Sequence, residues 1–113
     1  MEVLYRSTRG NGSTVTASNA ILKGLSEDGG LFVPDQIPAL EVPMEQLAQM
    51  SYQEVAYEVM SRFLTDFTEE ELKKCIQSAY DQKFDTDVIA PLVKADGAYY
   101  LELFHGSTIA FKD

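Results

Sequence analysis

Two stretches in the middle of the chain decide its fold: residues 51–64 read SYQEVAYEVMSRFL, and residues 68–80 read TEEELKKCIQSAY. In both stretches apolar residues recur every three or four positions, which places them on one face of an amphipathic helix. Each stretch opens with a hydroxyl residue, Ser51 or Thr68, that is followed three residues later by a glutamate. This is the spacing of a capping box, so we expect the helices to begin there. The short link between the helices predicts an antiparallel pair.

Shorter elements precede this helix pair. Residues 3–5 (VLY) are β-branched and aromatic, which favours a strand. Thr16 or Ser18 is placed to cap a short helix that ends near Gly24. Pro43 suits the first position of a further short helix, because its missing N–H has no partner there in any case.

A hairpin follows the helix pair. Residues 92–95 and 98–103 flank Asp96-Gly97, a dipeptide that favours a two-residue hairpin turn. We therefore predict an α+β fold in which amphipathic helices pack on a small sheet, built from this C-terminal β-hairpin and the first strand. A chain of this length has room for one core, so we expect one domain over residues 1–113.

Composition narrows the classes of partner and compartment. The chain has 9 basic and 18 acidic residues, a formal net charge of −9, which disfavours nucleic-acid and membrane partners. No apolar stretch approaches the roughly 20 residues that span a bilayer, and no secretory signal is present, so a cytoplasmic location is expected. Cys75 and His105 are the only residues of their kinds, which removes disulfides and the common zinc patterns. We expect no metal site.

Most polar clusters have a structural explanation. The acidic residues 66–71 supply favourable charge at a helix N-terminus. Residues 9–12 (RGNG) offer backbone N–H groups and a guanidinium to an anion, although an ordinary turn is the favoured interpretation. Residues 28–30 (DGG) also favour a turn. Cys75 lies on the apolar face of its helix, so we expect it to be buried and unreactive.

The last residues differ, because 103–113 read LFHGSTIAFKD and combine polar side chains with an apolar set. Ser107 or Thr108 is placed to begin a new helix, which would put Lys112 near a helix N-terminus among apolar residues. Periodicity alone favours a solvated surface lysine. Imine chemistry, however, needs a neutral amine, which desolvation and a helix dipole both favour. Because the chain stops where this element starts, we expect it to be a fragment.

Three motifs carry a family resemblance. Residues 103–113, together with YRSTRG at 5–10 and GLSEDGGLFVP at 24–34, closely resemble segments of threonine synthase, in the family's order. The resemblance implies the N-terminal part of a larger pyridoxal-phosphate α/β enzyme, several-fold longer than this chain. It also implies that Lys112 is the catalytic lysine that binds the cofactor covalently. The family usually reads His-Gly-Pro-Thr where this chain has a serine, so Ser107 and Thr108 become candidate substrate contacts.

The resemblance further implies conversion of O-phospho-L-homoserine and water to L-threonine and phosphate. The phosphate cradle and the partner of the pyridine nitrogen are then expected beyond Asp113. We expect these residues alone to be inactive and not to hold pyridoxal phosphate specifically. The carboxylates beside Lys112 would favour its charged form, which is the wrong form for an imine.

Two alternatives stay open from the sequence. One is a small acidic protein-interaction module, which the paired amphipathic helices fit equally well, although it leaves the three ordered motifs unexplained. The other is a segment of a different pyridoxal-phosphate lyase, of the threonine dehydratase or cysteine synthase type. An ordered apolar terminus needs something to pack on, so we also expect a second copy of the chain to associate through the hairpin edge or the helix pair.

Overall fold

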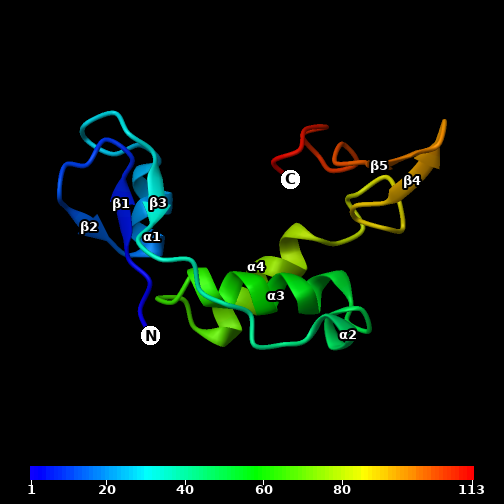
Figure 1. Ribbon diagram of the computed structural model, residues 1–113, viewed down its shortest axis with the longest axis horizontal. Coiled ribbons are helices and arrows are strands. Elements are labelled where there is room, and N and C mark those ends of the chain that lie inside the picture. The colour runs from blue at the N-terminus through cyan, green and yellow to red at the C-terminus, as the bar shows by residue number, and fades with distance from the viewer. The chain divides into compact units, whose positions relative to one another are not determined.

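The computed structural model describes residues 1–113 and contains four helices and five strands (Figure 1). The expected α+β class is confirmed. The contacts of the chain group into two compact units, residues 1–75 and 76–113, which are described separately below. The elements are, in order, β1 (Tyr5–Ser7), β2 (Thr14–Val15), α1 (Ala17–Lys23), β3 (Phe32–Pro34), α2 (Met44–Leu47), α3 (Tyr52–Phe63), α4 (Glu69–Ala79), β4 (Leu92–Ala95) and β5 (Ala98–Leu101).

A three-stranded antiparallel sheet forms the start of the first unit, with strand order β2-β1-β3. The central strand begins at Tyr5, two residues later than predicted. Val3 instead packs into the core at 2% exposure, and its N–H donates to Oγ1 of Thr65 at 3.0 Å. Tyr5 lies opposite both Val15 and Pro34, so β1 is paired along both edges.

Helix α1 has the ends that the sequence predicts. Thr16 is its N-cap and accepts a hydrogen bond from the N–H of Asn19, while Gly24 ends it with a φ of 73°. Its alanines at 17 and 20 are buried. The N–H of Ser18 also donates to Asp66 at 3.1 Å, which ties this helix to the turn after α3.

The two long helices begin at the predicted capping boxes. Ser51 and Glu54 exchange both bonds at the start of α3. At α4 the N–H of Thr68 donates to the Glu71 carboxylate at 2.9 Å, and the N–H of Glu71 donates back at 3.3 Å. Pro43 caps α2 instead of occupying its first turn.

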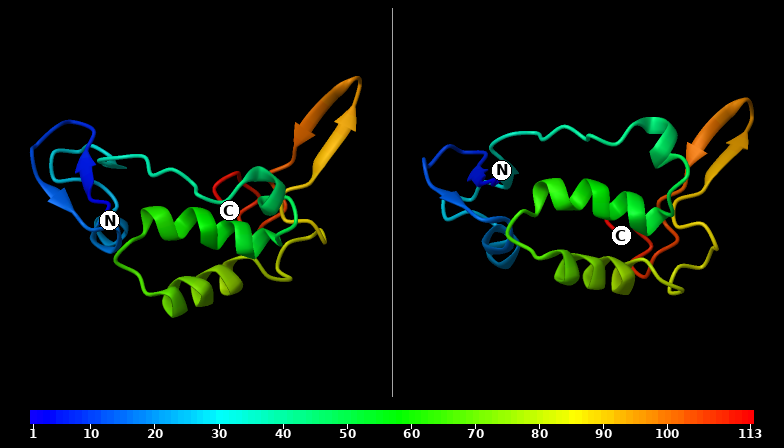
Figure 2. Two further views of the ribbon diagram at one scale, coloured as in Figure 1. Left: turned by 60° about the horizontal axis from the view of Figure 1, so that its bottom comes forward. Right: turned by 90° about the horizontal axis from the view of Figure 1, so that it is seen from below.

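Helices α3 and α4 run side by side in opposite directions, as predicted (Figure 2). The ammonium of Lys73 lies 5.0 Å from the centre of the Tyr57 ring and links them within the first unit. The expectation that Cys75 is buried is wrong, because this thiol is exposed. The buried positions of α4 are Leu72 and Ile76, four residues apart, and a helix turns by about 100° from one residue to the next. Cys75 is thereby rotated away from the buried stripe.

Strands β4 and β5 form the hairpin of the second unit. Ala95 lies opposite Ala98, and Asp96 and Gly97 both have positive φ, at 50° and 77°, as a two-residue hairpin turn requires. The expectation that this hairpin and the first strand share a sheet is wrong, since the hairpin is a two-stranded sheet of its own. The physical reason is that β2 and β3, both close to β1 in sequence, already occupy its two edges.

None of the four helices combines the length and the apolar character that crossing a bilayer requires.

Candidate functional site

The segment that carries Lys112 folds into two successive turns instead of the expected helix. The N–H of Ile109 donates to the carbonyl of Gly106 at 3.1 Å, and the N–H of Asp113 donates to the carbonyl of Ala110 at 3.3 Å. Ile109 has a φ of 58°, which no regular right-handed helix contains. The expectation of a helix beginning at Ser107 or Thr108 is therefore wrong for this chain.

Asp113 closes these turns into a loop, defined here as residues 106–113 and called the lysine loop. Its Oδ2 accepts a hydrogen bond from the N–H of Thr108 at 2.8 Å. A Cβ placed on Gly106 would lie 2.6 Å from the same oxygen, so the carboxylate fills the space a side chain would need. Hydrogen bonds from the Thr108 hydroxyl and N–H, with the charge of Lys112, lower the pKa of Asp113. The aspartate is therefore held in its charged, bond-accepting form.

Lys112 itself is exposed, and the apolar residues expected around it are exposed as well. Ile109 is 76% and Phe111 83% accessible, so neither shields the amine. Ser107 and Thr108 are also exposed. Ser107 lines a shallow hollow of the second unit together with Asp113 and residues from the end of α4 and the segment after it.

A covalently bound aldehyde cofactor needs an accessible primary amine, and Lys112 meets that requirement. The second unit has two further lysines, and both are engaged. Lys83 pairs with Asp81 at 2.9 Å, and the ammonium of Lys94 lies 5.7 Å from the Tyr99 ring centre. Lys112 therefore fits the attachment of the cofactor, while these residues form no cluster of basic side chains for its phosphate.

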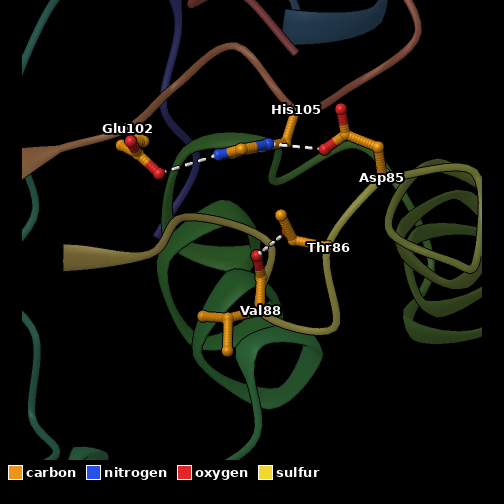
Figure 3. A network of polar contacts seen from close by, with 5 residues as sticks. All are labelled: Asp85, Thr86, Val88, Glu102 and His105. Atoms are coloured by element: carbon orange, nitrogen blue, oxygen red, sulfur yellow. Dashed lines mark hydrogen bonds and ion pairs between the residues drawn. The ribbon is translucent and has the colours of Figure 1, made fainter. Parts of the chain in front are cut away.

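His105 forms the most connected polar group of the second unit, and the sequence analysis assigned it no role. Its Nδ1 lies 2.5 Å from Oδ1 of Asp85, and its Nε2 lies 3.0 Å from Oε1 of Glu102 (Figure 3). The side chain of His105 is only 12% exposed. Glu102, three residues before His105, is a partner that the sequence could have suggested, whereas Asp85 is twenty residues away. No group of three or more histidine, cysteine or acidic side chains is arranged to hold a metal ion.

A second polar cluster joins two of the motifs in the first unit. The hydroxyl of Ser7 donates to Oδ1 of Asp28 at 2.6 Å, and the same oxygen accepts the N–H of Gly30 at 3.0 Å. The Arg9 guanidinium donates to the carbonyl of Asp28 at 2.9 Å, so this side chain binds the neighbouring turn. The turn interpretation of residues 9–12 and 28–30 is confirmed.

The bond from Ser7, followed by that from Gly30, lowers the pKa of Asp28. Oδ2 of the same carboxylate is buried and makes no hydrogen bond. The cluster thus holds a charged aspartate between the segments 5–10 and 24–34, which lie far apart in the sequence.

Comparison with known proteins identifies the family of this chain. Residues 4–80 match the family model described as "Threonine synthase N terminus". Threonine synthase of Schizosaccharomyces pombe is 42% identical over 99% of this chain and 22% of that protein. The enzyme of Pseudomonas aeruginosa is 38% identical over 96% of this chain and 24% of its own length.

Solved structures give the same result. The crystal structure of threonine synthase from yeast matches with a TM-score of 0.82 at 34% identity, covering 96% of this chain and 23% of that one. Threonine synthase from Brucella melitensis with bound pyridoxal phosphate matches with a TM-score of 0.81 at 36% identity, covering 98% of this chain and 24% of that one. The chain therefore belongs to the threonine synthase N-terminus family. It spans about a quarter of the length of these relatives.

Proposed function

We propose that the protein containing this chain is a threonine synthase, which converts O-phospho-L-homoserine and water to L-threonine and phosphate. The observation that supports this most directly is the segment 103–113, which resembles the cofactor-lysine segment of the family and contains the accessible amine of Lys112. The pyridoxal phosphate bound to the Brucella melitensis relative is further support.

Four residues of the lysine loop have a role in this proposal. Pyridoxal phosphate, when bound, supplies an electron sink for carbanion charge on an amino-acid substrate. Lys112 binds the cofactor aldehyde and carries a proton at Nζ. Asp113 holds the loop through the N–H of Thr108. The hydroxyls of Ser107 and Thr108 are assigned to the substrate. The residues that bind the two phosphates lie outside residues 1–113.

The substrate distinguishes this proposal from the related lyases. Phosphate release from O-phospho-L-homoserine by the complete natural protein is the expected activity. Deamination of threonine would instead indicate a threonine dehydratase, and replacement of acetate on O-acetylserine would indicate a cysteine synthase. Either of those activities, without phosphate release, would overturn the proposal.

The role of Lys112 is tested by replacement. In the complete protein, Lys112→Ala should abolish turnover and the covalent trapping of pyridoxal phosphate by borohydride, because the amine that attacks the aldehyde is gone. Lys94→Ala is the matched control, since it removes an exposed lysine of the same unit and should leave both unchanged. A Lys112→Ala protein that keeps its cofactor and its turnover would contradict the proposal.

The 113-residue chain alone is expected to behave differently. The side chains that surround Lys112 here leave it in solvent, and desolvation is what makes a lysine nucleophilic near neutral pH. We expect borohydride treatment of this chain with pyridoxal phosphate to modify several lysines without preference. Stoichiometric and selective modification of Lys112 would show this expectation to be wrong.

Self-association is a second candidate property of this chain. The hairpin strands have free edges, and the apolar side chains of Leu92, Tyr99 and Leu101 are exposed. A second copy pairing along this edge would bury them. Light scattering at micromolar concentration should then give twice the monomer mass, and a monomer at all concentrations would rule the pairing out.

A further inference from the structure

His105 links its own segment to two others in the second unit, the segment after α4 and the end of β5. Its ring bonds Asp85 on the segment after α4 and Glu102 at the end of β5 (Figure 3). The carbonyl of His105 also accepts the N–H of Asp85 at 3.1 Å. His105 thus holds Asp85 at two points, through its main-chain carbonyl and through its ring. We call these three bonds the histidine clasp.

The histidine clasp requires a protonated ring. A neutral imidazole has one N–H, so one of its nitrogens would present a lone pair to a carboxylate. Only the imidazolium donates to Asp85 and Glu102 together, and such charge-assisted bonds are stronger than neutral ones. Asp85 and Glu102 are the charged groups that face the ring, and the ring of Phe104 lies against it with centroids 4.5 Å apart.

The clasp adjoins the lysine loop without a break in the chain. Gly106 follows His105 directly, and Gly106 is the residue whose open side is filled by Asp113. From there the carboxylate of Asp113 reaches the N–H of Thr108, and Lys112 lies on the closed loop. The position from which the loop starts is therefore set at His105.

We propose that His105, bridged as an imidazolium between Asp85 and Glu102, is a positioning residue that fixes the base of the lysine loop and so aims the amine of Lys112. This role for catalysis rests on the proposed threonine synthase function. The clasp itself does not, because it is a property of residues 85–105 alone.

The proposal has a definite dependence on pH. The bond to Glu102 is the largest cause of the raised pKa of His105; burial opposes it, and the bond and charge of Asp85 add to the rise. A group whose pKa is raised on folding stabilises the fold fully below its ordinary pKa, about 6.5 for histidine. That contribution is lost as the pH rises through the raised value. While Asp85 and Glu102 are charged, the clasp should therefore be closed below the ordinary histidine pKa and should open as the pH rises through the raised value.

The first experiment observes the ring directly. His105 is the only histidine of the 113 residues, so nitrogen-15 spectra of this chain contain one imidazole. We expect a doubly protonated ring that persists above the pH at which free imidazole titrates. Asp85→Asn and Glu102→Gln should each shift the titration to lower pH, whereas Asp87→Asn, an exposed carboxyl of the same segment, should not. Titration like that of free imidazole, or equal shifts in all three variants, would overturn the clasp.

Hydrogen exchange adds a readout on the loop. The N–H groups of Asp85 and Thr108 should exchange faster once the pH passes the His105 titration, after correction for the intrinsic rise with pH. In His105→Gln, which carries no charge, the corrected rates should no longer depend on pH. A Thr108 rate that ignores the state of His105 would show that the clasp does not reach the loop.

The second experiment uses the complete protein. His105→Gln should lower kcat by roughly ten- to a hundredfold, the cost of a misplaced reacting group, while the cofactor remains attached at Lys112. Asp85→Asn should move the alkaline limb of the kcat profile to lower pH, and Asp87→Asn should leave it in place. An unchanged limb in Asp85→Asn would overturn the positioning role. Absence of phosphohomoserine turnover in the unmodified protein would instead overturn the proposed function, a result that the imidazole spectra do not depend on.

Discussion

Ser7 and Gly30 approach each other so closely that a Cβ placed on Gly30 would overlap Oγ of Ser7. The same Cβ would lie 3.0 Å from Oγ1 of Thr8 and 3.1 Å from the backbone nitrogen of Arg9. Gly30 does not adopt a positive φ, so its requirement for glycine is one of space. This contact binds the segment 24–34 to the strand β1.

Gly30→Ala should therefore destabilise the first unit by about 1–3 kcal/mol, the usual cost of overpacking a filled site. Urea unfolding followed by circular dichroism measures this change. Adding Ser7→Ala should recover part of the loss, because it removes the atom that clashes first. Strictly additive effects of the two substitutions would show that the contact is not the cause.

Ser51→Ala should destabilise the chain by about 1 kcal/mol, since the N-cap of α3 loses the bond from the N–H of Glu54. Ser61→Ala is the matched control, because it removes a hydroxyl from the last turn of the same helix, where alanine also favours helix. Thermal unfolding compares the two. A loss in Ser61→Ala as large as that in Ser51→Ala would argue against the capping box.

The stability of the first unit should fall in acid through Asp28. Its pKa is lowered by the bonds from Ser7 and Gly30, so its contribution is present above the unfolded value of about 3.9 and is lost as the pH falls further. Asp28→Asn should reduce the slope of the free energy of unfolding against pH below about pH 4. The exposed Asp35 is the control, and Asp35→Asn should keep the original slope.

Tyr5→Phe should cost about 1 kcal/mol in the free energy of unfolding. The Tyr5 hydroxyl donates to the carbonyl of Phe63 at 3.0 Å, which joins β1 to the end of α3. Tyr99→Phe, at a residue 67% exposed on the hairpin, should change stability little. Burial, followed by the charge of Asp66, raises the pKa of Tyr5. An ultraviolet titration of the wild type should therefore show one phenol that ionises at a higher pH than an ordinary tyrosine, and Tyr5→Phe should remove that step.

Local signals predicted most of the secondary structure correctly. The ends of α1, α3 and α4 depend on hydrogen bonds between residues three or four apart, and the hairpin depends on the φ preferences of Asp96 and Gly97. Such interactions depend on residues close together in the sequence, so the sequence of one protein is enough to predict them.

Features that have no local signature in the sequence were missed. The partners of β1 were decided by competition between strands, which no local pattern of residues 5–7 reveals. The loop at Lys112 was mistaken for a helix start because the bond from Thr108 to the Asp113 side chain has no signature in composition. Of the histidine clasp, only the contact from Glu102 to His105 had a detectable spacing, and Asp85 lies twenty residues away.

The tip of the hairpin has a practical consequence. A Cβ on Gly97 would meet no atom within 4 Å, and both strands that lead to this turn are exposed along their lengths. Loop tips with small residues tolerate insertions best, because no buried main chain has to move. A peptide tag or a fluorophore-binding sequence inserted between Asp96 and Gly97 would leave the ladder below it paired, which makes this turn the natural place to attach a reporter to the second unit.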